Sequence, residues 1–85
     1  MSKSAYSTAH SQLVSILIAA RHASGLQQTE LAAKIGKSQA YISNIERGQR
    51  RIDVLEFYAI ARAMEADPVH LFKTIVDKLP MKIII

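Results

Sequence analysis

Two amides, one hydroxyl and one guanidinium lie close together near the middle of this sequence, at Gln39, Asn44, Ser43 and Arg47. Ile42 and Ile45 fall between them at the spacing of a buried helical face, so a helix over 39–47 would turn the polar side chains outward. An amide can pair with adenine N6 and N7, and a guanidinium binds phosphate. Such a face suits the reading of base edges in the DNA major groove.

A second short helix is expected just before this one. Leu31 and Ile35 are spaced for the buried face of a helix over 28–35, and Ala32 is small where the next helix must pass close by. Gly36 can take the positive φ that ends this helix, and Ser38 is a suitable N-cap for the next. The pair predicts a helix-turn-helix over residues 28–47, whose second helix would enter the major groove.

Basic residues are concentrated around the same segment. The 85-residue chain carries a net charge of +4, and residues 34–51 alone carry five Lys or Arg side chains against one acid, Glu46. A basic patch of this kind attracts a polyanion such as DNA. A solvated basic face with no partner is the alternative interpretation of the charge taken alone.

Composition excludes several other classes of protein. Without cysteine the chain has no disulfide and no Cys-based zinc site, and its three His residues lack metal-ligand spacing. No nucleophile–base pair and no Gly-rich phosphate loop is present, so we expect no enzyme, no cofactor and no small-molecule ligand. The longest apolar run, 13–20, is far shorter than the ~20 residues that span a bilayer, so we expect a cytoplasmic protein without a membrane partner.

Three more helices complete the expected fold. An apolar stripe predicts a helix over about 9–24, with Val14 and Ile18 as a spare row beside it. Asp53 followed by Glu56 is a capping box for a fourth helix, and Asp67-Pro68 starts a fifth. The expected core residues of these last two helices are Val54, Phe57, Ile60, Ala61 and Met64, then Leu71, Phe72, Ile75, Val76 and Leu79.

Three segments of the sequence resemble the Cro/cI-type (XRE) family, small regulators with a lambda-repressor-like DNA-binding domain. They are 26–32 (LQQTELA), 36–43 (GKSQAYIS) and 45–48 (IERG). The resemblance covers residues 13–72 and implies an all-α, five-helix domain over 9–79, of bacterial or phage origin and associated with the nucleoid. Residues 1–8 would then be a flexible N-terminal arm, and 80–85 an apolar, extended tail.

The resemblance also implies roles at matching positions. Gln39, Ala40 and Asn44 would read bases, Ala40 through a methyl-sized contact. The side chains at phosphate-binding positions are Gln28, Tyr41, Ser43, Arg47, Arg50 and Arg51. Arg21 and Glu46 match a buried salt bridge between the first and third helices. Tyr41 is bulkier than is usual there, and covering the turn is an equal alternative to binding phosphate.

One short helix reads too few base pairs to select a site in a genome, so we expect a homodimer on a palindromic operator, acting as a repressor. The expected contact is the tail together with the residue before it (Leu79, Ile83, Ile84 and Ile85), the fifth helix or the spare row. An antitoxin or restriction–modification controller of the same fold is the alternative. A protein-interaction module that no longer binds DNA is another.

The position before Gln28 departs from the family pattern. The family usually has Thr or Ser there as an N-cap, whereas this chain has Gln27, a poor cap. The start of the second helix is therefore less well defined than its end.

Overall fold

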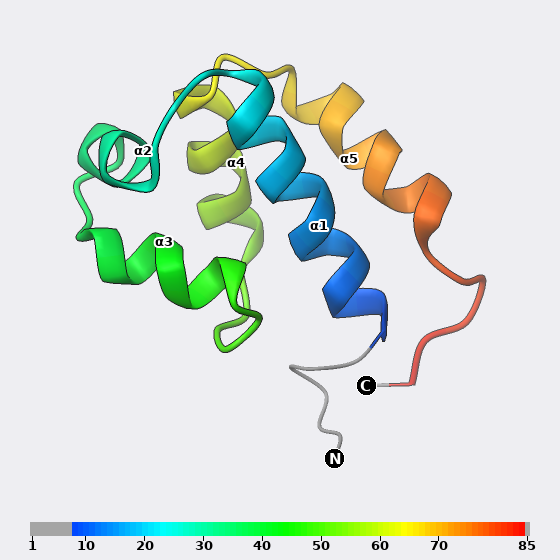
Figure 1. Cartoon of the computed structure of the whole chain (residues 1–85). Helices are drawn as coiled ribbons and strands as arrows, with labels where there is room; N and C mark the ends of the chain where they lie inside the picture. The colour runs from blue at the N-terminus through cyan, green and yellow to red at the C-terminus, as the bar shows by residue number, and fades with distance from the viewer. Residues whose placement is uncertain (1–7, 85) are drawn as a thin grey trace.

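The computed structural model describes residues 8–84, and this part of the chain forms five helices (Figure 1). They are α1 (Thr8–Ala23), α2 (Gln28–Lys34), α3 (Gln39–Glu46), α4 (Val54–Ala63) and α5 (Pro68–Lys78). The all-α, five-helix fold expected from the sequence is confirmed, and each helix begins or ends within two residues of its expected bounds.

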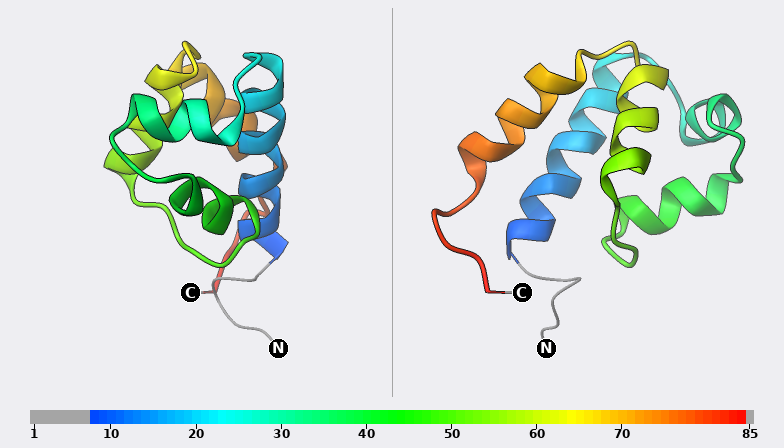
Figure 2. Two further views of the ribbon diagram at one scale, coloured as in Figure 1. Left: turned by 60° about the vertical axis from the view of Figure 1, so that its left-hand side comes forward. Right: turned by 180° about the vertical axis from the view of Figure 1, so that it is seen from behind.

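Helix α1 lies in the middle of the fold, with α3 on one side and α5 on the other (Figures 1 and 2). Helix α2 packs on α3 and α4, and α4 also packs on α5. The side chains where these helices meet form one apolar core that includes Leu17, Leu31, Ile42, Ile60 and Leu71. Ala32 is 1% exposed, so a larger side chain would not fit between the crossing helices.

Capping interactions define the ends of the helices. Ser38 Oγ accepts a hydrogen bond from the Tyr41 N–H, and Asp53 and Glu56 form the expected capping box of α4. Gly36, between α2 and α3, has a φ of +71°, a conformation that side-chain-bearing residues rarely adopt. These local interactions hold the turn between the two helices of the motif in one geometry.

Helix α2 begins at Gln28 although Gln27 is a poor cap. The Gln27 backbone is extended, and its N–H donates to Glu30 Oε1 at 2.8 Å. The Glu30 carboxylate therefore supplies a capping hydrogen bond at the N-terminal end of α2. Its negative charge also interacts favourably with the positive end of the helix dipole.

Three expected core residues and one expected surface residue are placed differently by the structure. Val54 is 80% exposed, and Phe72 and Val76 are about half exposed, whereas Val14 of the expected spare row is buried. Leu71 and Ile75 supply the buried face of α5, which turns Phe72 and Val76 toward its edge. Val14 is covered because α1 has a neighbouring helix on each side.

The two ends of the described chain also differ from expectation. Thr8 is the first residue of α1, so it does not belong to a flexible arm, and residues 1–7 lie outside the described residues. Residues 80–84 form neither helix nor strand. Their Ile83 and Ile84 line a cavity of about 260 Å³ together with Ala9 and His10, so the tail lies against the start of α1. Ile85 is outside the described residues.

Within residues 8–84, no helix is both long and apolar enough to cross a lipid bilayer.

Replacing a core residue of the motif should destabilise the fold far more than trimming the surface of α4. Ile42 is 2% exposed, so Ile42→Ala should lower the free energy of unfolding by about 2–5 kcal/mol. Leu55 is 78% exposed, so Leu55→Ala should change it by less than about 0.5 kcal/mol. Urea unfolding at one fixed protein concentration measures both, and similar losses would contradict this core assignment.

Candidate nucleic-acid interface

Helices α2 and α3 form the expected helix-turn-helix, and α3 carries a polar surface. Gln39 and Ala40 at its start are exposed, and Ser43 and Asn44 in its next turn are partly buried. Ile42 and Ile45, on the opposite side of α3, are each 2% exposed and hold the helix in the core. The polar side chains therefore share a face that the fold leaves uncovered.

A buried ion pair anchors α3 to α1. Arg21 Nε donates to Glu46 Oε2 at 2.6 Å, and Arg21 Nη2 donates to Glu46 Oε1 at 3.0 Å. Both side chains are only 10% exposed, and Arg21 Nη1 also donates to the Leu26 carbonyl at 2.9 Å. Because a buried charge without a partner is strongly destabilising, these bonds fix where α3 lies on α1.

Two glutamines extend this pair to the surface of α3. Gln28 Nε2 donates to Glu46 Oε1 at 2.8 Å, and Gln28 Oε1 accepts from Gln39 Nε2 at 2.6 Å. A carboxylate can only accept, so Glu46 dictates that Gln28 presents its nitrogen inward and its oxygen to Gln39. The Gln39 amide is held in turn by its nitrogen, which leaves its oxygen and its second N–H available.

The environment of Glu46 keeps its carboxylate charged. Burial acts to raise the pKa of Glu46, but the hydrogen bonds from Arg21 and Gln28 and the charge of Arg21 outweigh it, so the pKa is lowered. The acceptor that orients the two glutamines is therefore ionised at neutral pH.

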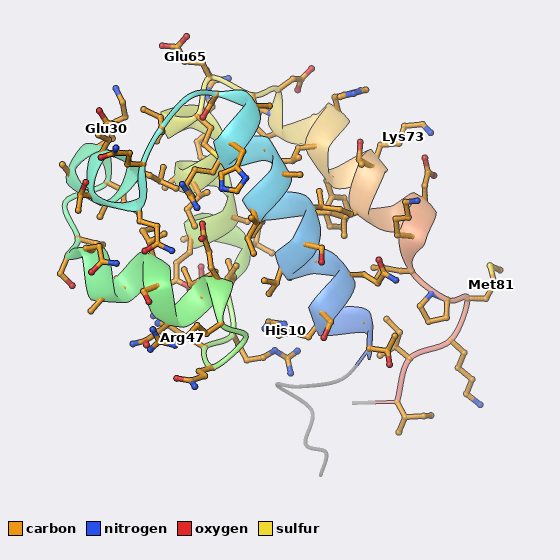
Figure 3. All side chains as sticks on the ribbon, viewed as in Figure 1. His10, Glu30, Arg47, Glu65, Lys73 and Met81 are labelled. Carbon is orange, nitrogen blue, oxygen red and sulfur yellow. The ribbon has the colours of Figure 1, made fainter. Side chains whose placement is uncertain are left out.

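A second cluster lies at the C-terminal end of α3. The Arg47 guanidinium donates to Ser43 Oγ, and its Nη2 donates to Asn44 Oδ1 at 2.6 Å. Figure 3 shows Arg47 at this end of the helix, next to the exposed connector that leads to α4. The structure thus brings together three of the side chains that the sequence assigned to DNA contacts.

Tyr41 and Arg50 form a third cluster with Glu56. The Arg50 guanidinium lies over the Tyr41 ring, 4.6 Å from its centroid, and Nη2 donates to Glu56 Oε2 at 2.9 Å. Lys37 lies 5.2 Å from the centroid of the same ring. Tyr41 is partly buried against the core and has the side chains of Lys37 and Arg50 over its ring, a position compatible with covering the turn.

Hydrogen bonds from Arg50 and from the Asp53 backbone lower the pKa of Glu56 to about 2. Burial and a hydrogen bond to Glu56 raise the pKa of Tyr41, so its hydroxyl stays protonated. The sequence identified Glu56 only as part of a capping box. Its pairing with Arg50 had no sequence signal, because it depends on how the connector folds back over the first turn of α4.

Arg51, in the connector between α3 and α4, and His10, in the first turn of α1, line the same cavity. Arg51 is exposed, whereas His10 is 6% exposed beneath the connector. Burial, and then the charge of Arg51, lower the pKa of His10, and a hydrogen bond to the Arg50 backbone opposes them. No pattern in the sequence predicted this position of His10. Within residues 8–84, no group of three or more His, Cys, Asp or Glu side chains is placed to hold a metal ion.

Most of this chain is similar to known helix-turn-helix proteins. A helix-turn-helix family model (HTH_3) matches residues 17–71, which is most of the chain. The chain belongs to the XRE family of helix-turn-helix transcriptional regulators. The matched segment includes the α2–α3 pair and the Arg21–Glu46 bridge described above.

Relatives of this XRE-family chain are similar over most of its length. The uncharacterized HTH-type transcriptional regulator y4dJ of Sinorhizobium fredii is 40% identical over 60 residues, which is 71% of this chain and 77% of that protein. The structure of an XRE-family like protein from Pseudomonas syringae is 36% identical, with a TM-score of 0.78 over 85% of this chain and 88% of that one.

The restriction–modification controller protein C.Esp1396I is also similar to this chain. It was solved as a tetramer in complex with its natural 35-base-pair operator. That structure is 27% identical to this chain, with a TM-score of 0.76 over 84% of this chain and 93% of that one.

The Arg50–Glu56 pair should make folding stability depend on acid. The folded pKa of Glu56 is about 2, below its ordinary value of 4.5, so its contribution is present above about pH 4.5 and is lost as the pH falls toward 2. Glu56→Gln should therefore lower stability at pH 7 and weaken its dependence on pH between 5 and 2. Urea unfolding across this range measures both effects, and an unchanged slope in the variant would contradict this assignment of Glu56.

Proposed function

We propose that this regulator binds a palindromic operator in double-stranded DNA as a homodimer and represses transcription. The observation that carries the proposal is the chain of hydrogen bonds from the buried Arg21–Glu46 pair through Gln28 to the exposed Gln39. An amide held in one orientation on an uncovered helix is suited to reading a base edge, because its donor and acceptor are already placed.

Gln39 is the principal base reader in this proposal. One of its two Nε2 hydrogens is bound to Gln28, so the other hydrogen and the oxygen remain for adenine N7 and N6. Ala40, beside it and exposed, offers a methyl-sized contact to a thymine methyl group. Asn44 reads a neighbouring base pair from the next turn of α3.

Phosphate contacts set the register of α3 in the groove. The side chains proposed for them are Gln28, Tyr41, Ser43, Arg47, Arg50 and Arg51. Arg51 is exposed, whereas Arg47 and Arg50 are bound to other side chains. A guanidinium has five N–H donors, so both retain donors for a phosphate oxygen. Their charge supplies most of the affinity, and the base contacts supply the discrimination.

An exposed apolar surface on α4 and α5 supports the homodimer. Val54, Tyr58, Val69 and Phe72 are each at least half exposed and line a groove of about 450 Å³. A second copy is the occupant we propose, because a single α3 reads too few base pairs and a two-fold pair reads two half-sites about 34 Å apart. Phe72 also lines the neighbouring cavity, together with Leu79, Ile83 and Ile84. The α4–α5 groove is therefore continuous with the tail that we propose for the same interface.

A restriction–modification controller is the second candidate function. It is favoured by the similarity to C.Esp1396I, whose operator complex contains a tetramer. A controller of that kind would bind its operator as a tetramer, whereas a simple repressor would place one dimer on one palindrome. Either regulator would act in the cytoplasm, where the DNA is.

Gln39→Ala should lower the preference for the operator over random duplex DNA more than it lowers binding to random DNA. The lost bidentate pair is worth about 1–3 kcal/mol of discrimination. Sites selected from random DNA supply the operator, and titrations at several salt concentrations give both affinities. Equal losses on the two DNAs would show that Gln39 reads no base. Wild-type binding that does not weaken as salt rises would contradict the DNA-binding proposal itself.

Phe72→Asp should convert the dimer into monomer, because it places a charge in the apolar groove. Sedimentation velocity measures the oligomeric state, and circular dichroism checks that the variant still folds. Lys73→Asp is the matched control, since Lys73 is exposed on the same helix but does not line the groove.

Deleting residues 80–85 tests the contribution of the tail to the dimer separately from that of the α4–α5 groove. A smaller loss of dimer than in Phe72→Asp is expected, because the deletion leaves the α4–α5 groove intact. A folded Phe72→Asp variant that stays fully dimeric would exclude this groove as the interface.

A further inference from the structure

We infer that Arg47 sets the base preference of Asn44, by holding its amide oxygen and leaving its NH₂ group to face the DNA. On this assignment Asn44 selects a base that offers hydrogen-bond acceptors, guanine above all. The inference rests on the proposed function, since it concerns the same face of α3.

The orientation of the Asn44 amide follows from the chemistry of its partner. Arg47 Nη2 lies 2.6 Å from Asn44 Oδ1. A guanidinium carries only donors, so the amide atom that faces it must be the oxygen, and the reverse orientation would set N–H against N–H. A hydrogen bond to a charged donor is roughly twice as strong as a neutral one, so it holds the amide firmly.

Ser43 fixes the guanidinium itself. Arg47 donates through a second nitrogen, Nη1, to Ser43 Oγ. Arg47 is the C-cap of α3, three and four positions after Asn44 and Ser43, so these contacts are local to the end of the helix. With two nitrogens bound, the guanidinium has one defined position beside Asn44 and still has donors for a phosphate.

Asn44 is therefore held by the opposite atom of its amide from Gln39. At the start of α3, the charge of Glu46 acts through Gln28 and holds Gln39 by its nitrogen. At the end of α3, the charge of Arg47 holds Asn44 by its oxygen. Gln39 thus offers one acceptor and one donor to the groove, whereas Asn44 turns its two N–H donors toward it.

This polarity discriminates among the bases in the major groove. Guanine presents two acceptors, N7 and O6, which match the two hydrogens of Asn44 Nδ2. Thymine presents one acceptor, O4, and cytosine presents a donor that opposes the NH₂ group. The bidentate pair with adenine needs Oδ1 as well, and the charged Arg47 guanidinium already occupies one of the two lone pairs of that oxygen, which weakens and constrains it as an acceptor for the base. We therefore expect guanine to be preferred and cytosine to be disfavoured.

Selection of binding sites from random DNA by the full-length chain tests this inference. The base pair that Asn44 contacts is the one whose preference is lost in Asn44→Ala. Wild type should select guanine there. Asn44→Asp keeps the contact with Arg47 but turns an acceptor toward the DNA, so the preference should move to cytosine by about tenfold or more. Arg47→Met frees the amide, so the preference should move toward adenine.

Matched controls separate the polarity of Asn44 from general losses of affinity. Arg47→Lys keeps a charged donor for Asn44 Oδ1 and should retain guanine. Arg51→Gln removes a charge that has no contact with Asn44, so it should lower affinity for every sequence and retain guanine. Selection of adenine by wild type, or a preference unchanged in both Asn44→Asp and Arg47→Met, would overturn the inference while leaving the proposed function standing. If wild type enriches no sequence, the proposed function fails, and the inference fails with it.

Discussion

The buried Arg21–Glu46 ion pair is the constraint on which the rest of this structure depends. It joins α1 to α3 across 25 positions of the sequence, with both side chains only 10% exposed. Losing either partner would leave an uncompensated charge in the core, at a cost of about 3–5 kcal/mol. The pair therefore restricts α3 to one position on α1, and the apolar contacts of Ile42 and Ile45 fill the space around it.

The same pair also sets the orientation of two amides at the start of α3. Glu46 can only accept hydrogen bonds, so its charge orients Gln28, and Gln28 orients Gln39. A surface amide on an isolated helix can rotate freely and must lose that freedom when it binds a base. Here part of that entropic cost is met during folding. One chain of contacts thus runs from a buried charge to an exposed amide.

Periodicity and capping chemistry predicted the helices well, because both act within a few residues. Asp53 with Glu56, Ser38 and Gly36 each have the role expected of them. Burial was predicted less well. Phe72 and Val76 fit an apolar stripe, but the face of α5 that becomes buried depends on where α1 and α4 lie, which periodicity does not encode. Sequence also indicated which side chains share the α3 surface, yet the orientation of each amide depends on partners from α1, α2 and the end of α3.

The central claim is that Gln39 reads a base because Gln28 holds it in position. A double-mutant cycle of Gln28→Ala and Gln39→Ala tests this claim most directly, with the ratio of operator to random-DNA affinity as the measured quantity. Any loss of the proposed phosphate contact of Gln28 cancels in this ratio, because it lowers the affinity for both DNAs by the same factor. Each single substitution should lower the ratio, and the double variant should lose little more than Gln39→Ala alone. Losses that simply add would show that the two glutamines act independently, and would contradict the account.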